Sequence, residues 1–445
     1  LSSGKGGQTS TIQVAMELHP KEMREEAEAT IDYDFVWEMY RNPKRYRDKR
    51  WSNVVLNHLE NNSCLVSKKG LYKCLKAYCS AHDSLDLESV VPLTFYLPTM
   101  DSAQEEAEAE SKGDYKEFLE FNATHATDVA EAAASSDATA PAVAAGPGYD
   151  DSKGIVWIVK PASYANRGFG IKVVQGLEEV QALLRAGSSS GSRTGTPDSR
   201  PGSTSSAILS KAARNCAVKN GWICQRYMLN PLLVAGRKFD IRIFVLIAHN
   251  KKDKSRAFSG YFFRDGYVRT SCKKYSLDSL SDRECHLTND AVQKKAKGYG
   301  KFEAGNKLSW DEWQEAINRD YPGSPTDIVR GNIIPGIKRL CTISLQAAAE
   351  KLCESKVNRS WELLGYDFMV DADFKPTLIE VNSNPCLEFS CPMLENLITN
   401  LFDNAFRKCL DPLFPPPALE SRTKATAEAV EALEAEEDML EQLYP

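Results

Sequence analysis

Residues 365–371, GYDFMVD, and residues 377–382, TLIEVN, form two apolar, strand-like segments near the C-terminal end of the chain. The segment between them, ADFKP at residues 372–376, has the polar and proline content of a hairpin connection. The pattern therefore predicts a two-stranded antiparallel ribbon. The polar residues of this ribbon are the candidates for a functional role.

Three oxygen-bearing side chains, Asp367, Glu380 and Asn382, lie on this ribbon. Side chains alternate along a strand, so Glu380 and Asn382 point to one face and Val381 points to the core. Mg²⁺ prefers oxygen ligands and takes one or two carboxylates together with phosphates and water. The ribbon therefore predicts a magnesium site. The alternative is that the two carboxylates are ordinary solvated acids at strand ends.

Composition limits the class of protein. The chain has 445 residues and 42% hydrophobic residues, which is typical of a globular protein of two or three domains. It contains no apolar run of about 18 residues, so we expect no membrane span and no membrane partner. The twelve cysteines form no C-x-x-C pair, which argues against a zinc site and favours reduced thiols in a cytosolic protein. The chain starts at Leu1, so its true start remains open.

Charge is unevenly distributed. Residues 101–137 carry a net charge of −9 and residues 418–445 carry −6, which leaves about +9 for the rest of a chain whose total is −6. A basic body attracts an acidic partner such as nucleic acid, anionic lipid or an acidic peptide. An ordinary solvated surface is the alternative.

Further polar residues could hold a nucleotide. Lys160 ends the apolar run IVWIV and precedes a glycine-containing turn, where the backbone can approach phosphate closely. Lys238, Asp240 and Arg242 alternate with Phe239 and Ile241, so they share one strand face. Such a charged row at the start of an apolar strand needs partners or a ligand. A structural row of ion pairs explains it equally well.

Taken together, the motifs resemble the tubulin-tyrosine ligase family, a branch of the ATP-grasp ligases. The matching text runs in the family's order from about residue 50 to residue 417: IVKP with NRGFGI, QRYM, RKFDIRIFVL, FFRDGYVRTS, CHLTNDAVQKK, YGKFEAGN, GYDFMVD and LIEVNSNP. The resemblance implies an α+β, ATP-grasp-like fold with antiparallel or mixed sheets flanked by helices.

The resemblance also implies roles for individual residues. Asp367, Glu380 and Asn382 are similar to the family's magnesium ligands, and Arg242, Arg269 and Lys238 to its catalytic residues. The two arginines would hold the amino acid and the acyl phosphate. The implied ATP-binding residues are Lys68, Lys160, Arg167, Gly168, Gln225, Arg226, Met228, Lys238, Asp240, His286, Thr288 and Asn289.

The implied reaction is ATP-dependent formation of an amide between a carboxylate of a tubulin C-terminal tail and a free amino acid, with ATP and Mg²⁺ as cofactors. The basic body fits an acidic tail. FFRDGYVRTS and CHLTNDAVQKK favour tyrosine as the amino acid, with glutamate or glycine as alternatives. We expect a cytoplasmic protein of the cytoskeleton, with the cilium or flagellum as a candidate location.

Two other classes of protein would show different sequence features. A catalytically silent microtubule-binding protein would lack a magnesium ligand, yet all three are present. A nucleic-acid binder would carry aromatic base-stacking motifs, which the sequence lacks, so we expect no nucleic-acid partner.

Composition predicts six segments along the chain. They are a disordered or partly helical start (1–32), a small N-terminal domain with mostly helical patterns (33–100), an acidic low-complexity insertion that is disordered apart from a helix near 115–121 (101–150), a central ATP-grasp domain with a flexible loop at 187–206 (151–229), a C-terminal ATP-grasp domain (230–417) and an acidic helical tail (418–445).

Overall fold

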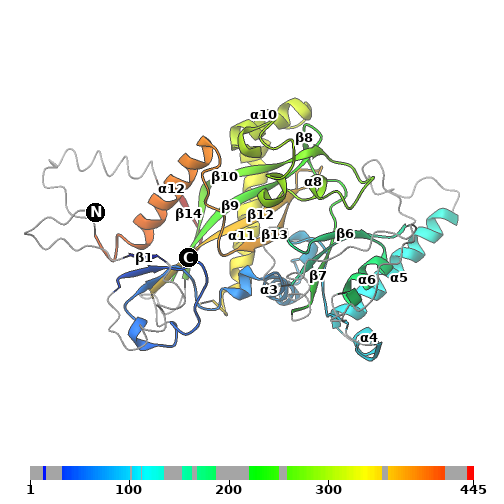
Figure 1. Cartoon of the computed structure of the whole chain (residues 1–445), viewed down its shortest axis with the longest axis horizontal. Helices are drawn as coiled ribbons and strands as arrows, with labels where there is room; N and C mark the ends of the chain where they lie inside the picture. Colours follow the sequence, from blue (N-terminus) through cyan, green and yellow to red (C-terminus); the bar gives the residue numbers. More distant parts are fainter. Residues whose placement is uncertain are drawn as a thin grey trace, which may run out of the picture.

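The protein is built around two β-sheets (Figure 1). The computed structural model describes residues 14–16, 33–100, 103–111, 113–134, 153–162, 168–186, 220–249, 258–352, 359–415 and 438–445. Helices flank both sheets, as the α+β prediction requires. Among the described residues, no helix combines the length and the apolar character needed to cross a bilayer.

The large sheet is mixed, with ten strands. Its main path runs β1 (Val14–Met16), β2 (Phe35–Trp37), β3 (Val55–Leu56), β12 (Arg359–Val370), β9 (Arg237–His249), β10 (Phe258–Lys274) and β11 (Lys307–Leu308). Three strands branch from this path: β13 (Pro376–Asn382) pairs with β12, β14 (Leu440–Tyr444) with β10, and β8 (Leu233–Val234) with β9. β12 and β13 form the antiparallel ribbon predicted from the sequence.

The small sheet is antiparallel and lies to the right in Figure 1. Its order is β4 (Thr94–Leu97), β7 (Trp222–Arg226), β5 (Val156–Pro161) and β6 (Lys172–Gln175). The predicted pairing of the IVWIV strand with the strand after the glycine turn is confirmed.

The α-helices divide into those of the N-terminal half and those of the C-terminal half of the chain. Those of the N-terminal half are α2 (Ser63–Val66), α3 (Lys68–Ser80), α4 (Ala103–Glu110), α5 (Gly113–Ala134) and α6 (Leu177–Ala186). Those of the C-terminal half are α8 (Arg283–His286), α9 (Asp290–Gln293), α10 (Trp310–Asp320), α11 (Ile334–Ala348) and α12 (Pro392–Cys409), with a π-helical turn, η6 (Val329–Ile333), before α11.

The alternation of β9 explains where a site can form. Its odd-numbered residues, from Phe239 to Ile247, pack in a core with α3, α10 and α11. On the other face, Phe244 and Leu246 pack in a core with α12. Lys238, Asp240 and Arg242 lie on this same face, nearer the start of the strand. The polar half of this face is therefore left for ligands and charged neighbours, and α12 covers the apolar half.

The predicted helix near residues 115–121 is confirmed as part of α5, but the prediction of disorder is wrong for α4 and for the rest of α5. Tyr115 and Phe118 of α5 are buried. The centroid of the Phe118 ring lies 5.2 Å from that of the Trp157 ring on β5. Lys76 of α3 also bonds Asp114 and Glu117 at 2.8 Å each. A few aromatic residues hidden in an Ala/Glu-rich sequence therefore anchor this segment. Residues 135–152 and the predicted flexible loop at 187–206 lie outside the described residues.

Three further expectations are wrong in the N-terminal part and the tail of the chain. The N-terminal segment read as helical contains strands β2 and β3, whose Phe35 and Val55 share a core with Trp361 of β12. The start of the chain, expected to be disordered or helical, contributes strand β1, which pairs in parallel with β2. In the tail, Leu440–Tyr444 is a strand rather than a helix because it completes the edge of β10. The rest of the predicted tail helix, up to residue 437, lies outside the described residues.

Candidate functional site

Four neighbouring strands bring the predicted acids and arginines together. The sheet registers place Arg269 of β10 opposite Asp240 of β9, and Asp367 of β12 opposite both Arg242 of β9 and Glu380 of β13. The charged residues therefore form one row across the sheet. Strand pairing, rather than loop geometry, sets their positions.

Asp367 lies at the centre of this row. Its Oδ1 accepts a hydrogen bond from Arg242 Nε at 2.6 Å, and its Oδ2 lies 2.9 Å from Arg269 Nη2. Burial alone would raise the pKa of Asp367, but Arg242 and Arg269 lower it to about 2. The carboxylate is therefore ionised at any physiological pH, as a metal ligand must be.

The three predicted magnesium ligands converge on one edge of the ribbon. Asn382 Nδ2 lies 3.3 Å from Asp367 Oδ2, and turning the amide over would present its oxygen instead. Glu380 Oε2 lies 3.3 Å from Lys68 Nζ. Val381 is buried, as the alternation predicted. Two carboxylates and an amide are a donor set suited to Mg²⁺, which completes its shell with water and phosphate. Among the described residues, no cluster of three or more His, Cys, Asp or Glu side chains is arranged to hold a metal ion.

Arg269 continues the row on the other side of Asp367. Its Nε and Nη2 bond the two oxygens of Asp240 at 2.6 Å each. Thr288 Oγ1 also donates to Asp240 Oδ2 at 2.7 Å. By contrast, Arg242 Nη1 is buried and has no hydrogen-bond partner among the described residues. This guanidinium therefore keeps a free donor for a ligand oxygen.

Two buried lysines lack a carboxylate partner. Lys160 Nζ contacts Gln225 Oε1 at 3.0 Å, and Lys238 Nζ contacts the Tyr227 hydroxyl and the His286 carbonyl at 3.0 Å. No ion pair to an acid within 4.0 Å is found for either lysine within the described part of the chain. Burial lowers the pKa of each lysine to about 8, although nearby carboxylates partly offset it. Desolvated cations of this kind are expected where an anionic ligand binds.

His286 and Gly168 complete the side of the site nearest the turn after β5. His286 Nε2 lies 3.0 Å from the Ser279 carbonyl, so it carries the proton, and Nδ1 accepts from the Tyr227 hydroxyl at 2.9 Å. Burial and Lys238 lower the pKa of His286, which keeps it neutral. Gly168 has φ +73°, and a Cβ there would lie 3.3 Å from Asn289 Oδ1. The glycine turn therefore packs closely against Asn289.

For three of the predicted ATP-binding residues, the described contacts give no side-chain position in the site. Arg226 ends β7, and its backbone N–H donates to the Leu93 carbonyl. Met228 follows it in the connection between the two sheets and is half-buried. Arg167 lies outside the described residues. Of the remaining predicted residues, Gln225 and His286 contact the two lysines and Lys68 pairs with Glu380 of the row.

Sequence reasoning missed two kinds of residue here. Tyr227 links Lys238 to His286, and it belongs to the recognised QRYM motif, so its position between two polar neighbours was a usable signal. Lys307 is buried beside Arg269 in the sheet and bonds Asp290 at 2.5 Å. Lys307 is a single lysine that follows Gly305 and Asn306, so no motif or alternation in the sequence pointed to it.

If the two lysines hold an anionic ligand such as ATP, the cofactor predicted from the sequence, its binding is expected to weaken at alkaline pH. The free lysines Lys160 and Lys238 are mostly charged below about pH 8 and mostly neutral above it. Between about pH 7 and about pH 9 the dissociation constant should rise about tenfold for each lysine that must regain its proton on binding. Titration with a fluorescent ATP analogue measures this. A Lys160→Arg variant, whose guanidinium does not titrate, should show a shallower dependence. A flat wild-type profile would contradict the assignment.

Comparison with known proteins identifies the family. The model of the tubulin-tyrosine ligase family matches residues 46–420. The chain is similar to protein polyglycylase TTLL10 of Macaca fascicularis, with 33% identity over 55% of this chain and 36% of that protein. It is also similar to probable tubulin polyglutamylase TTLL9 of Mus musculus, with 29% identity over 53% of this chain and 50% of that protein.

A third relative is protein monoglycylase TTLL8 of Homo sapiens, with 30% identity over 58% of this chain and 26% of that protein. The chain thus spans half or less of the length of these relatives. The family match itself covers most of the chain and includes every strand of the charged row. The chain therefore belongs to the tubulin-tyrosine ligase family.

Proposed function

We propose that this protein is an ATP-dependent carboxylate–amine ligase that adds glycine or glutamate to a tubulin C-terminal tail. The observation that carries the proposal is the pair of buried lysines without carboxylate partners, Lys160 and Lys238, beside the oxygen ligands Asp367, Glu380 and Asn382. Unmatched cations and hard-metal ligands side by side suit a magnesium-bound nucleotide.

The names of the relatives favour glycine or glutamate over the tyrosine expected from the sequence. These relatives are named as a polyglycylase, a monoglycylase and a probable tubulin polyglutamylase. Tyrosine therefore becomes the weaker candidate. By the same reasoning we propose a cytoskeletal location at microtubules, with the cilium as a further proposal.

In the proposed reaction, an oxygen of the acceptor carboxylate takes the γ-phosphoryl group of ATP, which forms an acyl phosphate and ADP. The amine nitrogen of the amino acid then bonds to the acyl carbon. The C–O bond to phosphate breaks, phosphate leaves with the electron pair, and the amine releases a proton. The result is an amide, formed without a protein nucleophile.

Residues of the row contribute positioning and charge. Lys160, Lys238 and Lys68 would hold phosphate oxygens, while Asp240 and Asp367 fix the orientation of Arg269 and Arg242. Arg242 Nη1, which is buried and has no partner among the described residues, would donate to an oxygen of the acyl phosphate. Asp367, Glu380 and Asn382 would hold Mg²⁺, which neutralises phosphoryl charge when bound. His286 stays neutral and positions Tyr227 beside Lys238.

Labelled glycine, glutamate and tyrosine, supplied separately with Mg-ATP and tubulin, test the proposal. We expect incorporation of glycine or glutamate, and loss of incorporation when the tubulin tails are first removed by limited proteolysis. Incorporation of tyrosine alone would restore the prediction made from sequence. Incorporation of none of the three, by protein that still binds ATP, would overturn the ligase proposal.

A further inference from the structure

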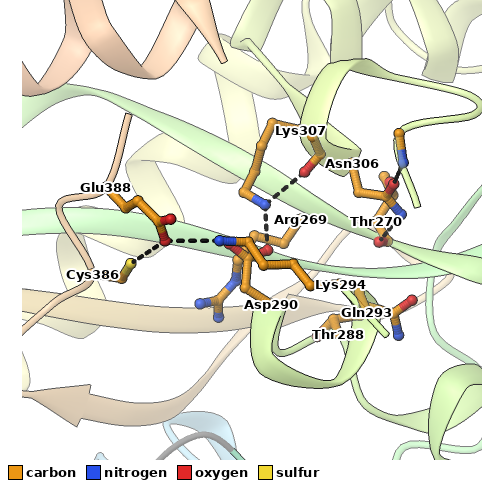
Figure 2. Close-up of polar contacts among 12 residues, drawn as sticks. Arg269, Thr270, Thr288, Asp290, Gln293, Lys294, Asn306, Lys307, Cys386 and Glu388 are labelled. Carbon is orange, nitrogen blue, oxygen red and sulfur yellow. Dashed lines mark hydrogen bonds and ion pairs between the residues drawn. The ribbon is translucent and has the colours of Figure 1, made fainter. Parts of the chain in front are cut away.

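A second polar cluster continues the charged row beyond Arg269, and we call it the outer cluster. Lys307 of β11 pairs with Arg269 of β10 in the sheet, so the cluster starts directly beside the row. Figure 2 shows Lys307, Asp290, Lys294 and Glu388 grouped next to Arg269. The outer cluster consists of Asp290, Lys294, Tyr299, Lys307, Glu388 and Ser390.

Two ion pairs of different strength build the outer cluster. Lys307 is almost completely buried, and its Nζ lies 2.5 Å from Asp290 Oδ1 and 2.9 Å from the Gly305 carbonyl. Burial lowers the pKa of Lys307, and Asp290 partly offsets this. Lys294 and Glu388 pair at 2.7 Å on the exposed side. An exposed pair of this kind stabilises the fold little, so it can open at little cost.

Two hydroxyl groups in the outer cluster have no hydrogen-bond partner among the described residues. Tyr299 Oη and Ser390 Oγ are both shielded from solvent. Both lie around Gly305, where a Cβ would be 3.7 Å from the first and 3.5 Å from the second. Burial and Asp290 raise the pKa of Tyr299, so its hydroxyl keeps its proton and can donate. Buried polar atoms without partners are uncommon in folded proteins and indicate a missing ligand or water.

The outer cluster differs from the nucleotide end of the site in its charge balance. At the nucleotide end, Lys160 and Lys238 have no carboxylate partner, which suits an anion. In the outer cluster each lysine faces one carboxylate. A site of paired opposite charges suits a ligand that carries both charges itself, because each end of the ligand can replace one partner of a pair.

We propose that the outer cluster binds the incoming free amino acid as a zwitterion. This inference rests on the proposed ligase function and assigns its second substrate to named residues. The carboxylate of the amino acid is held by Lys307 and by the hydroxyls of Tyr299 and Ser390. Its amine is held by Asp290, on the side that faces Arg269 and the acyl phosphate. Lys294 and Glu388 separate to admit it.

The first test uses Tyr299→Phe, which removes a hydroxyl that has no partner within the described protein. No hydrogen bond is lost from the free enzyme, so its melting temperature should not change. The KM for the amino acid should rise about threefold or more, and the KM for ATP should stay within about twofold. An unchanged KM for the amino acid would overturn the proposal.

The second test uses Lys307→Met, which should raise the KM for the amino acid about tenfold or more while ATP binding is retained. Lys295→Met, at an exposed lysine of the neighbouring loop, is the matched control and should leave both constants unchanged. If Lys307→Met fails to fold, Lys307→Arg retains the charge, and its altered reach should still raise the KM for the amino acid.

A partial reaction separates failure of this inference from failure of the ligase proposal. Scrambling of an isotopic oxygen label in ATP, dependent on tubulin but carried out without amino acid, reports acyl phosphate formation alone. Wild type, Tyr299→Phe and Lys307→Met should all scramble the label equally. Normal scrambling with unchanged amino-acid KM values overturns the outer-cluster assignment only. Absence of scrambling and of incorporation in wild type overturns both proposals.

Discussion

Replacement of Asp367 by asparagine is expected to destabilise the fold by about 3–5 kcal/mol, because it removes the anion that two buried arginines share. Asp367 is 3% exposed, and its oxygens meet Arg242 at 2.6 Å and Arg269 at 2.9 Å. The neutral amide keeps the shape of the side chain but not its charge. Arg269 retains Asp240, whereas Arg242 loses its only carboxylate partner among the described residues.

Urea unfolding of the Asp367→Asn variant measures this loss. Asp373→Asn is the matched control, because Asp373 is exposed on the connection between β12 and β13 and should change stability by less than about 0.5 kcal/mol. A variant at position 367 that unfolds within about 1 kcal/mol of wild type would show that the ion pairs contribute little. The Asp367→Asn variant should also fail to bind ATP in the presence of Mg²⁺.

Glu380→Gln is expected to leave the fold intact and to reduce turnover by about a thousandfold, since one charged group at a phosphoryl-transfer site has an effect of this size. The Glu380 side chain is 19% exposed, and its one ion pair in the described structure, to Lys68, is 3.3 Å long. The loss of a long, partly solvated pair costs little stability. The same change removes a negative ligand from the proposed metal site.

A double variant distinguishes metal binding from pairing with Lys68. If Glu380 only held Lys68 in place, Lys68→Met with Glu380→Gln would be no slower than Lys68→Met alone. We expect the double variant to be far slower, and its magnesium dependence to shift to higher concentration. Steady-state kinetics at several magnesium concentrations, with unfolding curves for each variant, provide both readouts. Full activity in Glu380→Gln would remove this residue from the metal site.

The elements that sequence predicted well are those with a local pattern. The ribbon of β12 and β13 has alternating residues and a polar connection, so both the strands and the convergence of Glu380 with Asn382 followed from spacing. The alternation of Lys238, Asp240 and Arg242 likewise placed them on one face. The sequence did not show which acid meets which arginine, because that depends on the register between strands far apart in the chain.

The elements that sequence missed depend on distant partners. Helix α5 extends well beyond the predicted helix near residues 115–121; contacts of Phe118 with Trp157 anchor it, and the surrounding Ala/Glu-rich composition gave no sign of them. Strand β14 has a sequence compatible with a helix and becomes a strand only because β10 offers an edge. Lys307 is buried by its pairing with Arg269, again across strands. In each case tertiary contacts override a weak local preference.

Strand β12 also determines how separable the parts of this chain are. Its first residues, Arg359 and Ser360, pair in parallel with β3, while Asp367 further along pairs with β13 and β9. One continuous backbone therefore serves both the N-terminal segment and the metal ligands. The N-terminal segment is thus no detachable module: trimming it would strip one end of the strand whose other end presents Asp367.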